Sequence, residues 1–267
     1  MVSATATAGP RNSRWLAAAV LGLLSSSYST LISQLSAERM GRDAAVDWMS
    51  VASIPARDWA LSSEPSSTAI AIGIAFHQWA DFSWALFFFG VLGRWTHEMR
   101  PGSLALLAVP WAAATSSLEW FVLVPLLPFW QPIFTLQQPL WIGFLVHLSS
   151  ALIYPLYPWL HENGLAVNHR RFVTTWMAAL AAILLGLACA NVLAHRDLEL
   201  GWIGKNPAID QTFIRHMSSH HQQGIALATL AVDRASDAHL RSLAKLMVAS
   251  QAGEQRILEN WWRRWFS

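Results

Sequence analysis

Five long apolar segments, separated by short polar stretches, occupy the first 195 residues of the chain. A helix needs about 20 apolar residues to cross a bilayer, and each segment has that length. Prolines lie near the ends of the third and fourth segments, so those boundaries are approximate. The pattern predicts an all-α fold, a polytopic membrane helix bundle within residues 1–195. The predicted spans are 15–35, 69–92, 104–127, 138–160 and 172–195.

The pattern changes after the fifth apolar segment. Residues 196–209 form a polar linker, and apolar positions then recur at helical spacing on both sides of the sequence "DRASDAH". This predicts a helical hairpin over residues 210–267, whose second helix covers about 238–266. Two helices bury little apolar surface, so we expect the hairpin to pack against the membrane domain or against a second copy in a four-helix bundle.

Composition agrees with a membrane protein. Only 13% of the residues are charged, about half the share that is usual in soluble domains. We therefore expect the lipid bilayer to surround the chain. No basic tract suggests nucleic acid as a partner. The single cysteine, Cys189, excludes an intrachain disulfide. No P-loop, dinucleotide fingerprint or HExxH motif occurs, so the sequence gives little reason to expect an enzyme.

Arginines in short loops predict the orientation, because such residues are enriched on the cytoplasmic side. With five spans, three basic segments fall on one side and the loop "PFWQPIFTLQQ", which has no charge, falls on the other. The N-terminus is therefore expected in the cytoplasm and the hairpin outside it, in the periplasm of a bacterium. The arginines concerned are Arg11, Arg14, Arg94, Arg100, Arg170 and Arg171.

The first apolar segment has two interpretations. The sequence "RNSRWLAAAVLGLLSSS" has the basic flank, apolar core and small residues of a cleaved signal peptide. The apolar stretch continues to Leu35, which is long for a signal, so we favour an uncleaved anchor. The orientation of the remaining spans is the same in both cases.

Three histidines and a methionine lie within six positions of the hairpin, at His216, Met217, His220 and His221. Residues three and four apart share a helix face, and Met217, His220 and His221 have that spacing. Thioether and imidazole ligands suit copper, above all Cu(I). The alternative is a solvated helix face with a methionine in the core.

The hairpin sequence resembles the CopM-like helical family, domain of unknown function 305. The resemblance implies a ferritin-like helical fold, here a half-bundle, a periplasmic or secreted location, and copper binding centred on Met217, His220 and His221. It rests on the sequences "DQTFIRHMSSHHQQGIALATLA" and "LRSLAKLMVASQAGEQRILENWW". The matching positions are Asp210, Phe213, Met217, His220, His221, Gln222, Leu243, Ala244, Gln251, Glu254 and Trp261.

Two departures from the family pattern limit the expected affinity. Leu227 and Leu258 stand where the family often has methionine. The loss of two soft ligands predicts a weak site, or one shared between subunits, with His216 as a further ligand. Other side chains that could assist are His239, Met247 and Glu254.

Four ionisable residues lie inside the predicted spans, at His77, Asp81, Glu119 and His147. At about 1.5 Å per residue, they share a level roughly 12–18 Å below the external surface. Such residues are costly in lipid and are usually functional. Three interpretations remain open: a metal site in which Asp81 is a ligand or a hydrogen-bond acceptor, a haem b between His77 and His147, or a hydrogen-bonded network that holds the bundle together.

Together these patterns suggest a copper-handling protein of the bacterial inner membrane, with a periplasmic His/Met hairpin and a buried His/Asp/Glu layer. The main alternative is a structural or accessory subunit of a larger membrane complex, with the hairpin as its docking module. A membrane haem b protein is the third interpretation. The chain could form a homo-oligomer under any of them.

Overall fold

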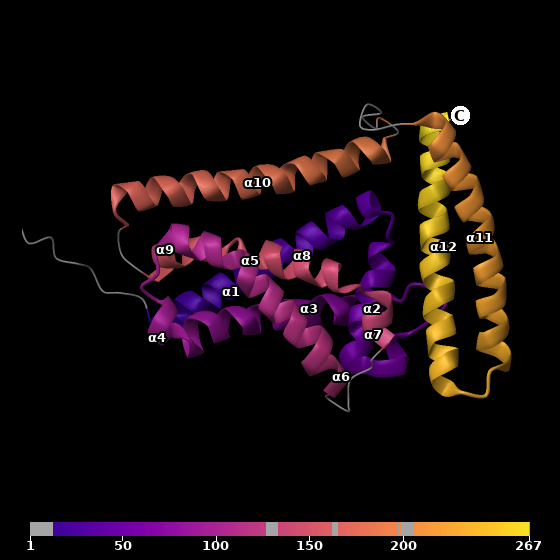
Figure 1. The fold of residues 1–267 in the computed structure, drawn as a ribbon, viewed down its shortest axis with the longest axis horizontal. Helices are drawn as coiled ribbons and strands as arrows, with labels where there is room; N and C mark the ends of the chain where they lie inside the picture. Colours follow the sequence, from indigo (N-terminus) through magenta and orange to yellow (C-terminus); the bar gives the residue numbers. More distant parts are fainter. Residues whose placement is uncertain (1–12, 127–132, 162–164, 197, 199–205, 267) are drawn as a thin grey trace, which may run out of the picture. The chain divides into compact units, whose positions relative to one another are not determined.

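Most residues that this computed structural model describes are helical; the described residues are 13–126, 133–161, 165–196, 198 and 206–266 (Figure 1). No strand occurs among them, so the predicted all-α class is confirmed. Arg11 and most of the linker lie outside the described residues. The α-helices are α1 (Arg14–Ala37), α2 (Ala44–Ala56), α3 (Ser67–Leu86), α4 (Gly93–Thr96), α5 (Pro101–Leu118), α6 (Val124–Leu126), α7 (Ile133–Gln137), α8 (Leu140–Ala151), α9 (Tyr157–His161), α10 (Val167–His195), α11 (Pro207–Arg234) and α12 (Ala238–Phe266).

Five shorter helical turns join or extend these helices. Three are 3-10 turns and two are π-helical turns, in which each backbone hydrogen bond spans one residue more than in an α-helix. The 3-10 turns are η1 (Glu38–Met40), η2 (Arg57–Ala60) and η5 (Tyr154–Leu156), and the π-helical turns are η3 (Phe87–Val91) and η4 (Glu119–Leu123).

Four of the five predicted spans are helices long and apolar enough to cross a membrane: Arg14–Met40, Pro101–Leu126, Leu140–His161 and Val167–His195. The chain is thus a membrane protein of helical type. The remaining predicted span, 69–92, coincides with α3 and η3 and is not among these candidates. The polar residues His77, Gln78 and Asp81 lie at its centre.

Apolar side chains cover the outside of α10. Only 11% of its most apolar stretch is buried within the protein, and Ile183 and Leu185 are more than half exposed. A helix that is apolar on all sides and yet exposed would be unstable in water. A bilayer solvates such a surface, and this supports the assignment of α10 as a spanning helix.

Contacts divide the chain into two compact units. The first unit comprises Met1–Thr30, Gln78–Ser117 and Trp141–Ile183, and the second comprises Leu31–His77, Leu118–Leu140 and Leu184–Ser267. The hairpin belongs to the second unit, with α2 and α7.

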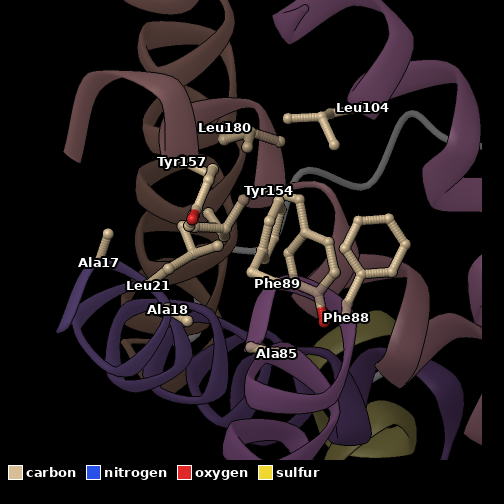
Figure 2. Packing of buried hydrophobic residues seen from close by; sticks show 11 residues of the cluster. Ala17, Ala18, Leu21, Ala85, Phe88, Phe89, Leu104, Tyr154, Tyr157 and Leu180 are labelled. Carbon is tan, nitrogen blue, oxygen red and sulfur yellow. The ribbon is translucent and has the colours of Figure 1, made fainter. Parts of the chain in front are cut away.

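An aromatic core holds the first unit together (Figure 2). The rings of Phe89 and Tyr157 are stacked, with centroids 3.9 Å apart, and both residues are fully buried. Small residues such as Ala18 and Ala85 lie beside these rings. Helices in membranes associate through such small positions, because a short side chain lets two backbones approach closely.

The second unit is built around α2. Its N-terminal cap is Asp43, whose carboxylate accepts a hydrogen bond from the Ala45 amide (2.9 Å). Helix α3 crosses α2 at Gly73, where a Cβ atom would lie only 2.0 Å from the Trp48 carbonyl oxygen. Apolar residues of α2, α7 and α12 form a further cluster, in which Leu246 of α12 is fully buried. The hairpin therefore packs against α2.

Helices α11 and α12 form the predicted antiparallel hairpin, and α12 lies between α2 and α11 (Figure 1). Asn206 caps α11 and Pro207 occupies its first turn, which is favourable because proline has no amide hydrogen to satisfy there. At the turn, the Leu240 amide donates to the Asp237 carboxylate (2.8 Å), and this bond lowers the pKa of Asp237. The predicted second helix, 238–266, is confirmed.

The crossing at Gly73 predicts a steric test. We expect Gly73→Ala to lower the melting temperature of the detergent-solubilised protein, because the added methyl group meets backbone and overpacking costs about 1–3 kcal/mol. Gly186→Ala in α10 is the matched control, because nothing lies within 4 Å of a Cβ atom there. Equal melting temperatures for the two variants would show that α2 and α3 do not meet at this point.

Candidate functional site: a buried histidine in the hairpin

His221 of α11 is the buried member of the histidine motif, with 5% of its surface exposed. Its Nε2 atom lies 2.7 Å from Oε2 of Glu254 on α12. The two residues therefore join the helices of the hairpin through a hydrogen bond to a carboxylate, which is stronger than a bond between neutral groups.

Glu254 is itself fixed by neighbouring side chains. The Ser250 hydroxyl donates to Oε1 of Glu254 (3.2 Å), and the amide of Gln137 in α7 donates to the Ser250 hydroxyl (2.9 Å). All four residues belong to the second unit. A chain of hydrogen bonds thus runs from α7 through α12 to the imidazole of His221.

These hydrogen bonds determine which nitrogen of His221 is available to bind a ligand. Because an ionised carboxylate only accepts hydrogen bonds, the hydrogen lies on Nε2 and the neutral ring keeps a lone pair on Nδ1. The Nδ1 atom is buried and has no hydrogen-bond partner among the residues that the structure describes. Histidines that bind metals usually have this arrangement, with one nitrogen held by a carboxylate and the other facing the metal.

The other residues of the motif divide between two faces of α11. Met217 lies one turn before His221 and is half-buried, so these two share the inner face. His216 and His220 are exposed and also lie four residues apart. The predicted set of Met217, His220 and His221 is therefore split, because neighbouring residues on a helix point about 100° apart.

The assisting residues are also separated. Glu254 contacts His221, whereas His239 and Met247 are exposed on α12. Gly224 lets α11 approach α12 beside this site, since a Cβ atom there would lie 2.0 Å from the Gln251 side-chain oxygen. The inner face is therefore closely packed around His221.

A second polar cluster lies in the first unit. The Nε2 atom of His147 in α8 lies 3.8 Å from Oδ1 of Asp81 in α3. The hydroxyl of Ser116 in α5 lies 2.8 Å from Nδ1 of His147, and the hydroxyl of Ser29 in α1 donates to the other oxygen of Asp81. All four residues are buried. Side chains from four helices thus pair their polar groups in one place.

The predicted layer of ionisable residues is distributed over both units. Asp81 and His147 meet in the first unit, while His77 and Glu119 belong to the second. The His77 ring packs edge-on against Trp48 (centroids 5.3 Å apart), and Glu119 begins the π-helical turn η4. Within the described residues, no group of three His, Cys, Asp or Glu side chains could hold a metal ion. The metal and haem interpretations of this layer stay predictions.

Ser29 and Ser116 are the residues of this cluster that sequence reasoning missed. Each lies within a run of small polar residues, "SSSYS" and "TSS", that has no distinctive spacing. The depth of each serine follows from its position along the predicted span. The direction of its side chain, however, depends on how the helices are rotated relative to one another.

Comparison with known proteins identifies the hairpin. Residues 210–267 match the family model described as Domain of unknown function (DUF305). The C-terminal segment is therefore similar to the DUF305 family, as its motif indicated. Neither a curated protein nor a solved structure matches the chain.

The polar cluster of the first unit predicts energetic coupling between Asp81 and His147. We expect His147→Leu and Asp81→Leu each to lower the melting temperature, because each removes a polar interaction inside the helix bundle. The double variant should lose less than the sum of the two, with an interaction energy of about 1–3 kcal/mol.

Ser149→Ala is the matched control, since the Ser149 hydroxyl donates only to the Val146 carbonyl of the same helix. Combined with Asp81→Leu, it should give additive losses. Additive losses for Asp81→Leu and His147→Leu themselves would show that these residues are not coupled.

Proposed function

We propose that this protein binds copper at the hairpin and presents it on the outer side of the bacterial inner membrane. The observation that carries this proposal is the buried Nδ1 atom of His221, which has no partner while Glu254 holds the opposite nitrogen. A lone pair left in this state costs about 1–3 kcal/mol. A bound metal ion would recover that cost.

The neighbouring donor favours copper over harder ions. Met217 lies on the same face as His221, one turn towards the N-terminus, and helical side chains lean in that direction. A thioether and an imidazole form a soft pair, which suits Cu(I) and not magnesium or calcium. In this proposal Glu254 orients the imidazole and is not itself a ligand.

Contacts within the second unit support the outer location of the hairpin. Helices α2 and α7 are too short to cross a bilayer, and the Gln138 amide after α7 donates to Asp47 of α2 (2.8 Å). Segments that touch in this way lie on one side of the membrane, so the chain between them crosses it an even number of times.

The candidate span Pro101–Leu126 accounts for one of these crossings. Helix α3 with η3 supplies the second, which favours five spans over four. The bond between Gln137 and Ser250 brings α12 to the same side as α2 and α7. With the arginine-rich loops in the cytoplasm, this side is the periplasm.

The proposal predicts a specific loss of Cu(I) binding. The full-length protein in detergent should compete with a Cu(I) chelator such as bicinchoninate, and His221→Ala should weaken its affinity by at least ~tenfold, because the anchoring imidazole is lost. Glu254→Gln should give a smaller loss, since the amide still holds the ring but makes it less basic.

His169→Ala, at the start of α10, is the matched histidine control and should bind as the unmodified protein does. Circular dichroism of each variant separates loss of the site from loss of the hairpin. An affinity for Cu(I) that is equal in the unmodified protein and in His221→Ala would refute the proposed site.

A further inference from the structure

The outward face of α11 carries a regular row of exposed residues. Their separations alternate between four and three, the spacing at which side chains form a continuous seam along a helix. The row is distinct from the inner face, where Ile214, His221 and Ala228 are buried. The members of the row, called the α11 seam below, are Ile209, Phe213, His216, His220, Gln223, Leu227 and Leu230, and all are exposed.

The ends of the α11 seam are apolar and its centre is polar. Leu227 is 68% exposed and Ile209 is 64% exposed, and Phe213 and Leu230 are also at least half exposed. Single exposed apolar residues are ordinary on protein surfaces. Four of them aligned along one helix resemble a contact surface, because regular spacing lets them pack simultaneously against a second helix.

The order of apolar and polar positions in the seam is the same in both directions. About a point near His220, Ile209 corresponds to Leu230, Phe213 corresponds to Leu227, and His216 corresponds to Gln223. A two-fold interface requires this property, since each surface must match itself after rotation. An antiparallel pair of α11 helices would therefore join apolar to apolar residues, and place an imidazole opposite an amide that can hydrogen-bond to it.

Charge at the helix ends supports the antiparallel direction. Asp210 lies in the first turn of α11 and Arg234 lies in its last turn. Antiparallel pairing brings Asp210 of one helix towards Arg234 of the other, which lies four residues beyond Leu230 and so continues the seam, whereas Asp233 lies one position away from it. This direction also opposes the two helix dipoles, whereas parallel pairing would place like charges together.

We propose that the α11 seam binds a second copy of this chain, with the two α11 helices antiparallel and His220 of each copy near the two-fold axis. Helix α12 of each copy packs on the far side of its α11, so the dimer has a four-helix core. The apolar pairs supply the affinity, and the central polar residues select one register, as buried polar residues do in coiled coils. This interface does not depend on copper binding at His221.

Cysteine cross-linking tests both the partner and the direction. In a Cys189→Ser background, which removes the native exposed thiol, His220→Cys should give a covalent dimer with a short bis-maleimide. Phe213→Cys and Leu227→Cys should each fail to cross-link alone, because the like residues lie far apart in an antiparallel pair. The double variant Phe213→Cys/Leu227→Cys should cross-link, since each thiol faces the other type across the interface.

Several outcomes would overturn the proposal. Dimers from Phe213→Cys alone or Leu227→Cys alone would indicate parallel pairing. Cross-linking within one chain does not confuse the result, because positions 213 and 227 lie roughly 21 Å apart along the helix. The absence of any cross-link from His220→Cys, in detergent and in liposomes alike, would show that the seam does not bind a second copy.

The mass of the protein–detergent complex gives an independent test. By light scattering the unmodified protein should contain two chains, and Leu227→Glu should weaken the dimer by at least ~tenfold, because it places a charge against Phe213 of the second copy in an apolar contact. Ser219→Glu is the matched control, because Ser219 is exposed on α11 but lies outside the seam. Equal masses for the unmodified protein and Leu227→Glu would contradict the proposal. A second result would also contradict it: the protein is a monomer, and the thiol of Phe213→Cys reacts with a water-soluble reagent in detergent but not in liposomes. Lipid, and not a second copy, would then cover the seam.

Discussion

The arrangement of the second unit depends on Asp43, because its carboxylate joins the start of α2 to the middle of α12. One oxygen caps α2 through the Ala45 amide, and the other accepts a hydrogen bond from the Arg256 guanidinium (2.7 Å). The backbone of α12 can come this close only because residue 253 is glycine, since a Cβ atom there would lie 2.5 Å from Cβ of Asp43. The docked position of α12 in turn brings Ser250 to Gln137 and sets the partners of Glu254. The hydrogen bond of His221 to Glu254 therefore depends on the contact between Asp43 and Arg256 at the start of α2.

Much of the fold could be predicted from the sequence, because it follows from local patterns. Four apolar segments are candidate spans, and the two helices of the hairpin begin where Asn206 and Asp237 accept hydrogen bonds from amides of their first turns. The helix over 69–92 has the length of a span, but it is not among the candidate spans, and polar residues lie at its centre. Its assignment as a fifth span is a proposal that rests on the contact between α2 and α7, which lie far apart in the sequence.

The candidate site was predicted less completely, because the sequence does not show how α11 is rotated about its own axis. The sequence placed Met217, His220 and His221 on one face, since spacings of three and four are compatible with that. Once α11 packs against α12, His221 turns inward with Met217, while His220 turns outward with His216. No local signal distinguishes these two pairs, because the choice is made by the helix that covers them. Similarly, Asp81 and His147 could be assigned to one depth, but Ser29 and Ser116 become their partners only through the packing of four helices.

The hydrogen-bond chain from Gln137 to His221 has a mechanical consequence. Gln137 ends α7, which lies between two candidate spans, so a shift of those spans relative to α12 would strain the bond to Ser250. Glu254 would then hold the Nε2 hydrogen of His221 differently, and the electron density on Nδ1 would change with it. Thermodynamic linkage makes this coupling reciprocal: if the position of α7 changes the affinity of Nδ1 for a ligand, the bound ligand changes the preferred position of α7 by the same free energy. A ligand bound at Nδ1 of His221 would thus be coupled to α7 through Glu254, Ser250 and Gln137.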